Sequence, residues 1–87
     1  MSQPHLEIMF RKGKAVAAYL RVAGQRRVAT SRQVRPTIVA DLDEEGALLG
    51  LELLDPRHTE VEEVQRVLAE LHASAVAVAD LAPLRAA

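Results

Sequence analysis

The chain has 87 residues, which is the size of a single domain. It contains no cysteine, and this excludes both a disulfide-stapled scaffold and catalysis by a thiol. The formal net charge is -1, but the charges are separated along the chain: eight basic residues and no acid lie between Arg11 and Arg35, whereas ten acids lie between Asp41 and Glu70. This separation points to a charged partner, nucleic acid included.

Two further properties bear on environment and assembly. The first residues contain no apolar segment typical of a secretion signal, and no run of about 18 apolar residues is present to cross a bilayer. We therefore expect a soluble, cytoplasmic protein. Phe10 and Tyr19 are the only aromatic residues, so small aliphatic side chains must fill a thin core. Because oligomerisation compensates for a thin core, we expect a homo-oligomer, dimeric or larger.

Alternating apolar and polar residues predict β-strands in the first two thirds of the chain. In the second of these strands, Ala18 and Leu20 fall on one face and Tyr19 and Arg21 on the other. The polar stretch that follows is typical of an edge strand, and Pro36 suits the start of the next strand. We expect strands over residues 5–11, 14–23, 26–35, 36–42 and 47–54.

The last predicted strand is unusual because it is apolar on both faces. A turn over residues 43–46 precedes it, with Gly46 in the left-handed conformation. Its leucines divide between the faces: Leu49, Leu51 and Leu53 on one, Leu48 and Leu54 on the other. Such strands are covered on both sides, so we expect a helix on one face and a second subunit on the other. The candidate interface residues are Leu48, Gly50, Leu54 and Tyr19.

One helix is expected after the strands, over about residues 59–73. Thr59 and Glu62 have the spacing of a capping box, and apolar residues recur at helical spacing from Val61 onward. Pro83 is expected to end any helix before it, and the tail over residues 74–87 stays open between helix, strand and disorder. The fold class is therefore α+β: a small, mostly antiparallel sheet of four or five strands with one amphipathic helix packed on one face.

The stretch DLDEEGALLGLELLD, from Asp41 to Asp55, follows the pattern D-x-D-x-x-G-x-x-x-G-x-E-x-L. The segment AYLRV, residues 18–22, loosely matches a strand that precedes this pattern. Together they resemble a family of short bacterial, archaeal and phage proteins known only as a domain of unknown function. The resemblance covers about residues 6–56. It implies a small β-sheet module and brings no activity, cofactor or catalytic residue with it.

The same acidic stretch has the ligand spacing of a calcium-binding EF-hand loop. The residues at the ligand positions are Asp41, Asp43, Glu45 and Glu52, with Gly46 at the sharp turn. An EF-hand needs a helix on each side, whereas the flanking residues here are predicted strands. We therefore interpret the stretch as a solvated acidic turn, and we expect neither a metal nor a cofactor.

Nucleic-acid binding is the alternative suggested by the basic stretch. A two-stranded basic ribbon can track phosphates and enter a major groove. The candidates for such contacts are Arg21, Arg26, Arg27, Arg32 and Arg35. Aromatic residues for base stacking are nearly absent, however, and the acidic half of the chain would repel a phosphate backbone. We therefore rank nucleic-acid binding below self-association.

Catalysis has the weakest support in the sequence. No nucleophile or phosphate-binding motif occurs. His58 lies near Asp55 and Glu62, and Asp41 and Glu52 are expected to face each other across the hairpin on one face, where a carboxylate pair serves acid–base chemistry or a structural hydrogen bond. The leading prediction is a self-associating interaction module without an activity of its own. A nucleic-acid-associated or regulatory protein comes second, and a small enzyme or cation-binding protein comes third.

Overall fold

The computed structural model describes residues 5–23, 27–73 and 78–86. In these residues five strands form one antiparallel sheet in the order β1-β2-β5-β4-β3, followed by a short 3-10 helix and two α-helices. The predicted α+β class with an antiparallel sheet is confirmed, but there are two helices instead of one. The elements are β1 His5–Arg11, β2 Lys14–Arg21, β3 Thr30–Arg35, β4 Ile38–Leu42, β5 Leu48–Leu53, η1 Pro56–His58, α1 Val61–Glu70 and α2 Val78–Arg85.

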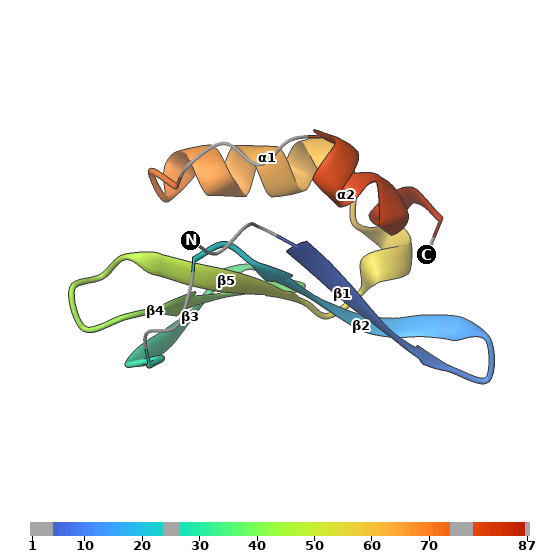
Figure 1. Cartoon of the computed structure of the whole chain (residues 1–87), viewed down its shortest axis with the longest axis horizontal. Helices are drawn as coiled ribbons and strands as arrows, with labels where there is room; N and C mark the ends of the chain where they lie inside the picture. The colour runs from blue at the N-terminus through green and yellow to red at the C-terminus, as the bar shows by residue number, and fades with distance from the viewer. Residues whose placement is uncertain (1–4, 24–26, 74–77, 87) are drawn as a thin grey trace.

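Both helices lie on the same face of the sheet, as Figure 1 shows. The core lies between these two layers. Sheet residues such as Leu20, Ile38 and Leu51 are completely buried there, and α1 contributes Val64 and Val67, which are equally buried. Because each side chain of this kind stabilises the fold by about 1.5–3 kcal/mol on burial, this single layer of contacts supplies most of the stability. The opposite face of the sheet is covered by no element of the described residues.

The helix α1 begins slightly later than the sequence predicted. Glu60 is its N-cap residue and makes no capping hydrogen bond through its side chain. The Thr59 hydroxyl instead donates to the carbonyl oxygen of Asp55 at 2.7 Å. The predicted capping box is therefore wrong: η1 precedes α1 directly, and Thr59 is buried where it closes that turn.

The second helix was not predicted. Pro83, expected to end any helix before it, lies inside α2. A proline in a helix interior removes a backbone hydrogen bond, but a helix of eight residues has few such bonds to lose. Leu81 and Leu84 are buried in the core, and their burial offsets that loss. Residues 74–77, part of the tail that the sequence left open, lie outside the described residues.

Four strands are shorter than predicted, among them β5, which covers Leu48–Leu53 instead of residues 47–54. β2 ends at Arg21 instead of residue 23. β3 begins at Thr30, and the predicted start at residue 26 lies outside the described residues. Pro36 lies in the turn between β3 and β4, so β4 begins at Ile38. Proline has no N–H group for the ladder, which makes the turn a suitable place for it. β3 is an edge strand, as its polar sequence predicted.

The register of β5 places its leucines differently from simple alternation. The pairing of β4 with β5 shifts between Asp41 and Leu42, so that Leu42 pairs with Leu48. Leu48 was expected on the face opposite Leu51, but it belongs to the same buried core cluster. A bulge of this kind rotates the side chains that follow it, and alternation in the sequence does not reveal it. Gly46 has a φ of 82°, which is the predicted left-handed conformation.

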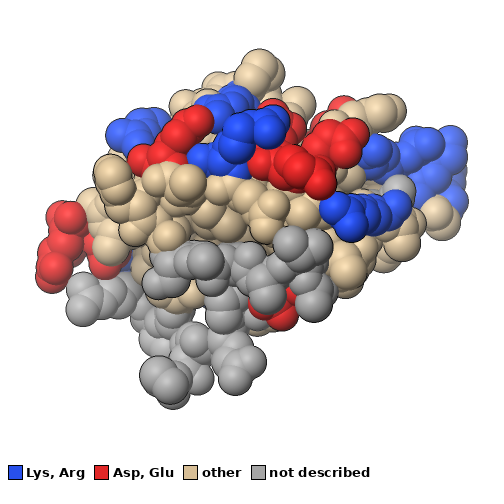
Figure 2. All heavy atoms as spheres, turned by 90° about the horizontal axis from the view of Figure 1, so that it is seen from above, with Lys and Arg blue, Asp and Glu red and all other residues tan. Residues whose placement is uncertain are grey.

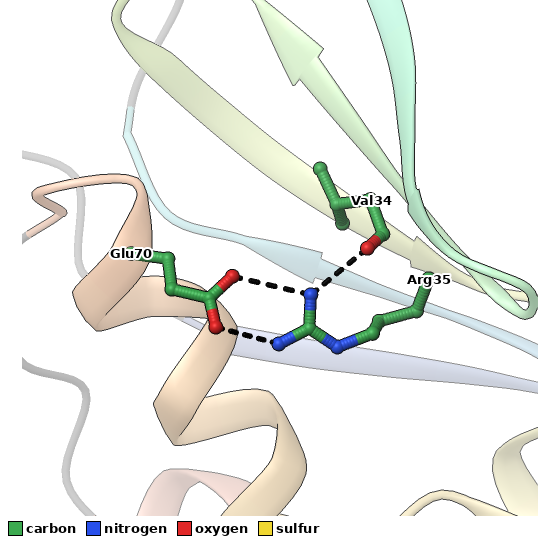
Figure 3. Close-up of polar contacts among 3 residues, drawn as sticks. All are labelled: Val34, Arg35 and Glu70. Atoms are coloured by element: carbon green, nitrogen blue, oxygen red, sulfur yellow. Dashed lines mark hydrogen bonds and ion pairs between the residues drawn. The ribbon is translucent and has the colours of Figure 1, made fainter.

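An ion pair links the edge strand β3 to α1, and Figure 3 shows its geometry. The Arg35 guanidinium donates two hydrogen bonds to the Glu70 carboxylate, at 3.1 and 2.7 Å, and a third to the carbonyl oxygen of Val34 at 2.9 Å. The two hydrogen bonds from Arg35 lower the pKa of Glu70 below its usual range. This pair is exposed, so it orients the helix more than it stabilises the fold.

Candidate functional site

The uncovered face of the sheet carries two neighbouring rows of side chains. Strand pairing places one row across all five strands in the order His5, Arg21, Gly50, Asp41 and Ser31. The next row runs Glu7, Tyr19, Glu52, Val39 and Gln33. Side chains that are paired across strands share a face, so both rows point away from the helices. This face therefore brings together residues from both charged halves of the sequence.

A hydrogen-bonded chain crosses the middle of this face. The Tyr19 hydroxyl donates to one carboxylate oxygen of Asp41 at 3.1 Å, and the Ser31 hydroxyl donates to the other at 2.8 Å. Asp41 is only 8% exposed, so these two donors compensate for the loss of water around its charge. To reach Asp41, the Tyr19 ring passes over Gly50, where a Cβ would collide with the phenol. Gly50 thus makes room for the Tyr19 ring.

The environment of Tyr19 keeps its hydroxyl protonated. Burial, the negative charge of Asp41 and the hydrogen bond to it together raise the pKa of Tyr19 to about 12. Arg21 opposes this shift, since its guanidinium carbon lies 5.6 Å from the centre of the Tyr19 ring. A phenol held in this way is a poor general base at neutral pH, so the geometry favours a structural role for Tyr19.

A shallow hollow of about 390 Å³ lies over β1, β2 and β5, beside the hydrogen bonds that join Tyr19, Asp41 and Ser31. Met9 and Leu54, which are 65% and 52% exposed, border the same hollow and so form an exposed apolar patch. The carboxylates of Glu7 and Glu52 also border it, together with the ring of Tyr19. The hollow therefore combines apolar walls with negative charge. Two of the predicted interface residues, Tyr19 and Leu54, lie at this hollow.

The residues of the EF-hand spacing are engaged in different ways. Asp41 binds Tyr19 and Ser31, as described above. One oxygen of Asp43 accepts the backbone N–H groups of Glu45 and Ala47, at 2.8 and 2.9 Å, and closes the turn. Within the ranges that the structure describes, no group of three or more potential ligands is arranged to hold a metal ion. The resemblance to EF-hand spacing therefore comes from a β-hairpin in which Asp41 and Asp43 bind different groups of the protein.

The predicted carboxylate pair is displaced from register. Asp41 pairs with Gly50, and Glu52 pairs with Val39, so the two acids share a face but stand in neighbouring rows. Asp41 is buried while Glu52 is exposed. The expectation that they face each other directly is therefore wrong, because the register is offset by two residues. The predicted neighbours His58 and Asp55 do lie together, with Nδ1 3.0 Å from both carboxylate oxygens, but the His58 side chain is 76% exposed and the Asp55 side chain 44%.

The predicted nucleic-acid residues are dispersed over the molecule. Arg21 lies over Tyr19, Arg35 is paired with Glu70, and Arg27 borders a second hollow with acidic residues of the turn after β4. Arg32 is exposed on β3, and Arg26 lies outside the described residues. Figure 2 shows basic and acidic side chains interleaved on the helix-bearing face, with a basic group at the end where Figure 1 places the β1–β2 hairpin. No continuous basic track is visible on that face.

Comparison with known proteins shows a family match over part of the chain. Residues 15–56 match the family model of DUF2283, a protein of unknown function. The expected resemblance to a family of unknown function is thereby shown. The DUF2283 match runs from β2 to the first residue of η1, so β1, α1 and α2 lie outside it. No curated protein and no solved structure matches the chain.

The DUF2283 segment contains the whole hydrogen-bonded chain over Gly50 but only part of the hollow. Glu7 and Met9, which complete the hollow, come from β1 and lie before the matched residues. Sequence reasoning missed Ser31, Glu7 and Met9 as site residues. No sequence pattern marked Ser31 as a site residue, because its partner Asp41 was interpreted as part of a solvated acidic turn. Glu7 and Met9 alternate with the apolar residues of β1, and this period places them on the uncovered face.

In the described residues, no helix is long and apolar enough to cross a membrane.

Proposed function

We propose that this protein is an interaction module that associates with a second copy of itself through the uncovered face of its sheet. One observation carries the proposal: Met9 and Leu54 stand exposed at a hollow on the face that no described element covers. An exposed cluster of large apolar residues with a polar rim is typical of a protein interface. Hydrogen bonds from Tyr19 and Ser31 to Asp41 hold the side chains beside the hollow in place, so the surface is pre-formed.

The surface chemistry supports association more than catalysis. Tyr19 and Asp41 bind each other, and Asp41 also binds Ser31, so these polar groups have partners already. The carboxylates at the hollow are exposed. A protein interface combines exposed apolar side chains at its centre with charged groups at its rim, and this face offers both.

Concentration-dependent melting tests the proposal. Because association stabilises the folded chain by mass action, the melting temperature is expected to rise as protomer concentration rises over two or three orders of magnitude. A Leu54→Lys variant, with a charge at the exposed apolar site, serves as the matched comparison and is expected to melt at a temperature that changes much less with concentration. A melting temperature of the unmodified protein that is independent of concentration would contradict self-association.

The basic stretch keeps nucleic-acid binding as a second prediction from the sequence, but no geometric observation favours it. Arg11, Lys12 and Lys14 are exposed and follow one another closely along the β1–β2 hairpin. The sheet and acidic neighbours separate the candidates that the structure describes, which are Arg21, Arg27, Arg32 and Arg35. Self-association is therefore the function that the geometry supports best.

A further inference from the structure

The hollow on the uncovered face has the chemistry of a socket for an arginine side chain. Its walls include the apolar Met9 and Leu54, and its border holds the carboxylates of Glu7 and Glu52 beside the Tyr19 ring. Arginine suits such a site because its aliphatic stem packs on apolar surface while its guanidinium binds carboxylates and stacks on an aromatic ring. The socket therefore selects a cation on an apolar stem instead of a purely apolar group.

An arginine stands on the same face, one row away from the socket. Arg21 is exposed, and its guanidinium lies 5.6 Å from the Tyr19 ring centre. In the described parts of the chain it forms no ion pair, although Glu52 lies diagonally across the β2–β5 pairing. The strand register thus keeps this cation and the two carboxylates in neighbouring rows, close enough to share a face but not paired with each other.

We propose that two copies of the chain dock face to face, with each Arg21 entering the hollow of the other copy between Glu7 and Glu52. This inference rests on the self-association proposed above and adds the register of the interface. A two-fold axis that runs across the strands, between the two rows, places the Arg21 row of one copy against the Tyr19 row of the other. Each Arg21 then meets the hollow of the other copy, so the same contact forms twice, as an isologous dimer requires.

Charge complementarity is what assigns the face to a second copy. The face carries the cation and the carboxylates that would neutralise it, so it is complementary to itself when rotated by half a turn. The same arrangement covers Met9 and Leu54, which are exposed in the single chain. A partner of another kind would need its own arginine at this position and would leave Arg21 without a carboxylate.

A charge-exchange experiment tests this register. Arg21→Glu and Glu52→Arg are each expected to weaken the dimer at least about tenfold, because each creates like charges across the interface. An equimolar mixture of the two variants restores both opposite-charge contacts, and so does the double variant. The dissociation constant in each case is expected to return to within a few-fold of the original, as measured by sedimentation velocity over a dilution series. Arg32→Glu, on the helix side of β3, is the control and should leave the dimer unchanged.

The outcomes separate this register from self-association itself. A dimer that is insensitive to both single variants, or single variants that weaken it without recovery in the mixture, would overturn the register and leave self-association standing. An unmodified protein that stays monomeric would overturn both. If Arg21→Glu fails to fold by circular dichroism, Arg21→Gln replaces it, and a dimer no weaker than the original would then overturn the register.

Discussion

Gly50 and Tyr19 fit closely against each other on the uncovered face. The phenol of Tyr19 lies where a side chain at position 50 would begin, and its hydroxyl reaches the buried carboxylate of Asp41. A glycine inside a strand often marks the close approach of another group, and the sequence alone left open which group approaches Gly50. Nor did the sequence show that the Tyr19 ring binds Asp41, because the β2–β5–β4 order that brings them together is a property of the whole sheet.

Gly50→Ala is expected to destabilise the fold by about 1–3 kcal/mol, as overpacking does. The added Cβ would collide with the Tyr19 phenol and would lie 2.8 Å from the carbonyl oxygen of Leu20. Chemical unfolding measures the loss. In a Tyr19→Ala background only the contact with Leu20 remains, so the same substitution should cost less there. An equal loss in both backgrounds would show that Tyr19 does not occupy the space over Gly50.

The ionisation of Tyr19 gives a second test at this scale. Its pKa of about 12 lies above the ordinary value near 10, so the folded state holds the proton more tightly than the unfolded state does. The resulting stability is complete below pH 10 and is lost as the pH rises from about 10 to 12. Because the chain has one tyrosine, the ultraviolet absorbance of tyrosinate reports its titration directly.

The expected titration midpoint is about 12 for the native protein. Asp41→Asn removes the negative charge, so its midpoint should be lower; burial, the largest cause of the shift, should keep it above 10. A native midpoint near 10 would mean that Tyr19 is exposed to water and does not bind Asp41.

At the scale of elements, β5 contributes both to the core under the helices and to the hollow on the uncovered face. Leu53 is completely buried under the helices, whereas Leu54, directly after the strand, is 52% exposed at the hollow. The sequence predicted a strand that is apolar on both sides. Leu54 stands on the uncovered side as expected, whereas the bulge after Asp41 rotates Leu48 into the core. The start of α1 was also misjudged, since the spacing of Thr59 and Glu62 cannot reveal that η1 uses the Thr59 hydroxyl.

Alanine substitutions of these adjacent leucines should separate folding from association. Leu53→Ala is expected to lower the free energy of unfolding by about 2–5 kcal/mol, as the loss of a buried leucine does. Leu54→Ala should change the stability of the single chain by about 0.5 kcal/mol or less, yet weaken the dimer. Urea unfolding at low protein concentration and sedimentation at higher concentration measure the two effects. Two variants with equal losses of stability would contradict the assignment of Leu54 to the interface.

At the scale of the whole molecule, the central feature is a two-layer fold with one uncovered sheet face. Figure 1 shows both helices on the other side of the sheet. The sequence predicted this asymmetry in outline, because its amphipathic helix supplies one apolar stripe while the sheet has two faces. The second helix escaped prediction, since Pro83 indicated a helix end and the burial of Leu81 and Leu84 depends on the tertiary fold.

The proposed dimer can be observed in a native mass spectrum of gently purified, untagged protein, recorded at low and at moderate salt. We expect a ligand-free species at twice the 9.5 kDa mass of the chain in both solutions. Apolar contacts around Met9 and Leu54 should keep the dimer at moderate salt, since screening weakens exposed charge pairs far more than buried apolar surface. A monomer in both solutions, or a species that carries nucleic acid or another protein, would contradict the proposed dimer.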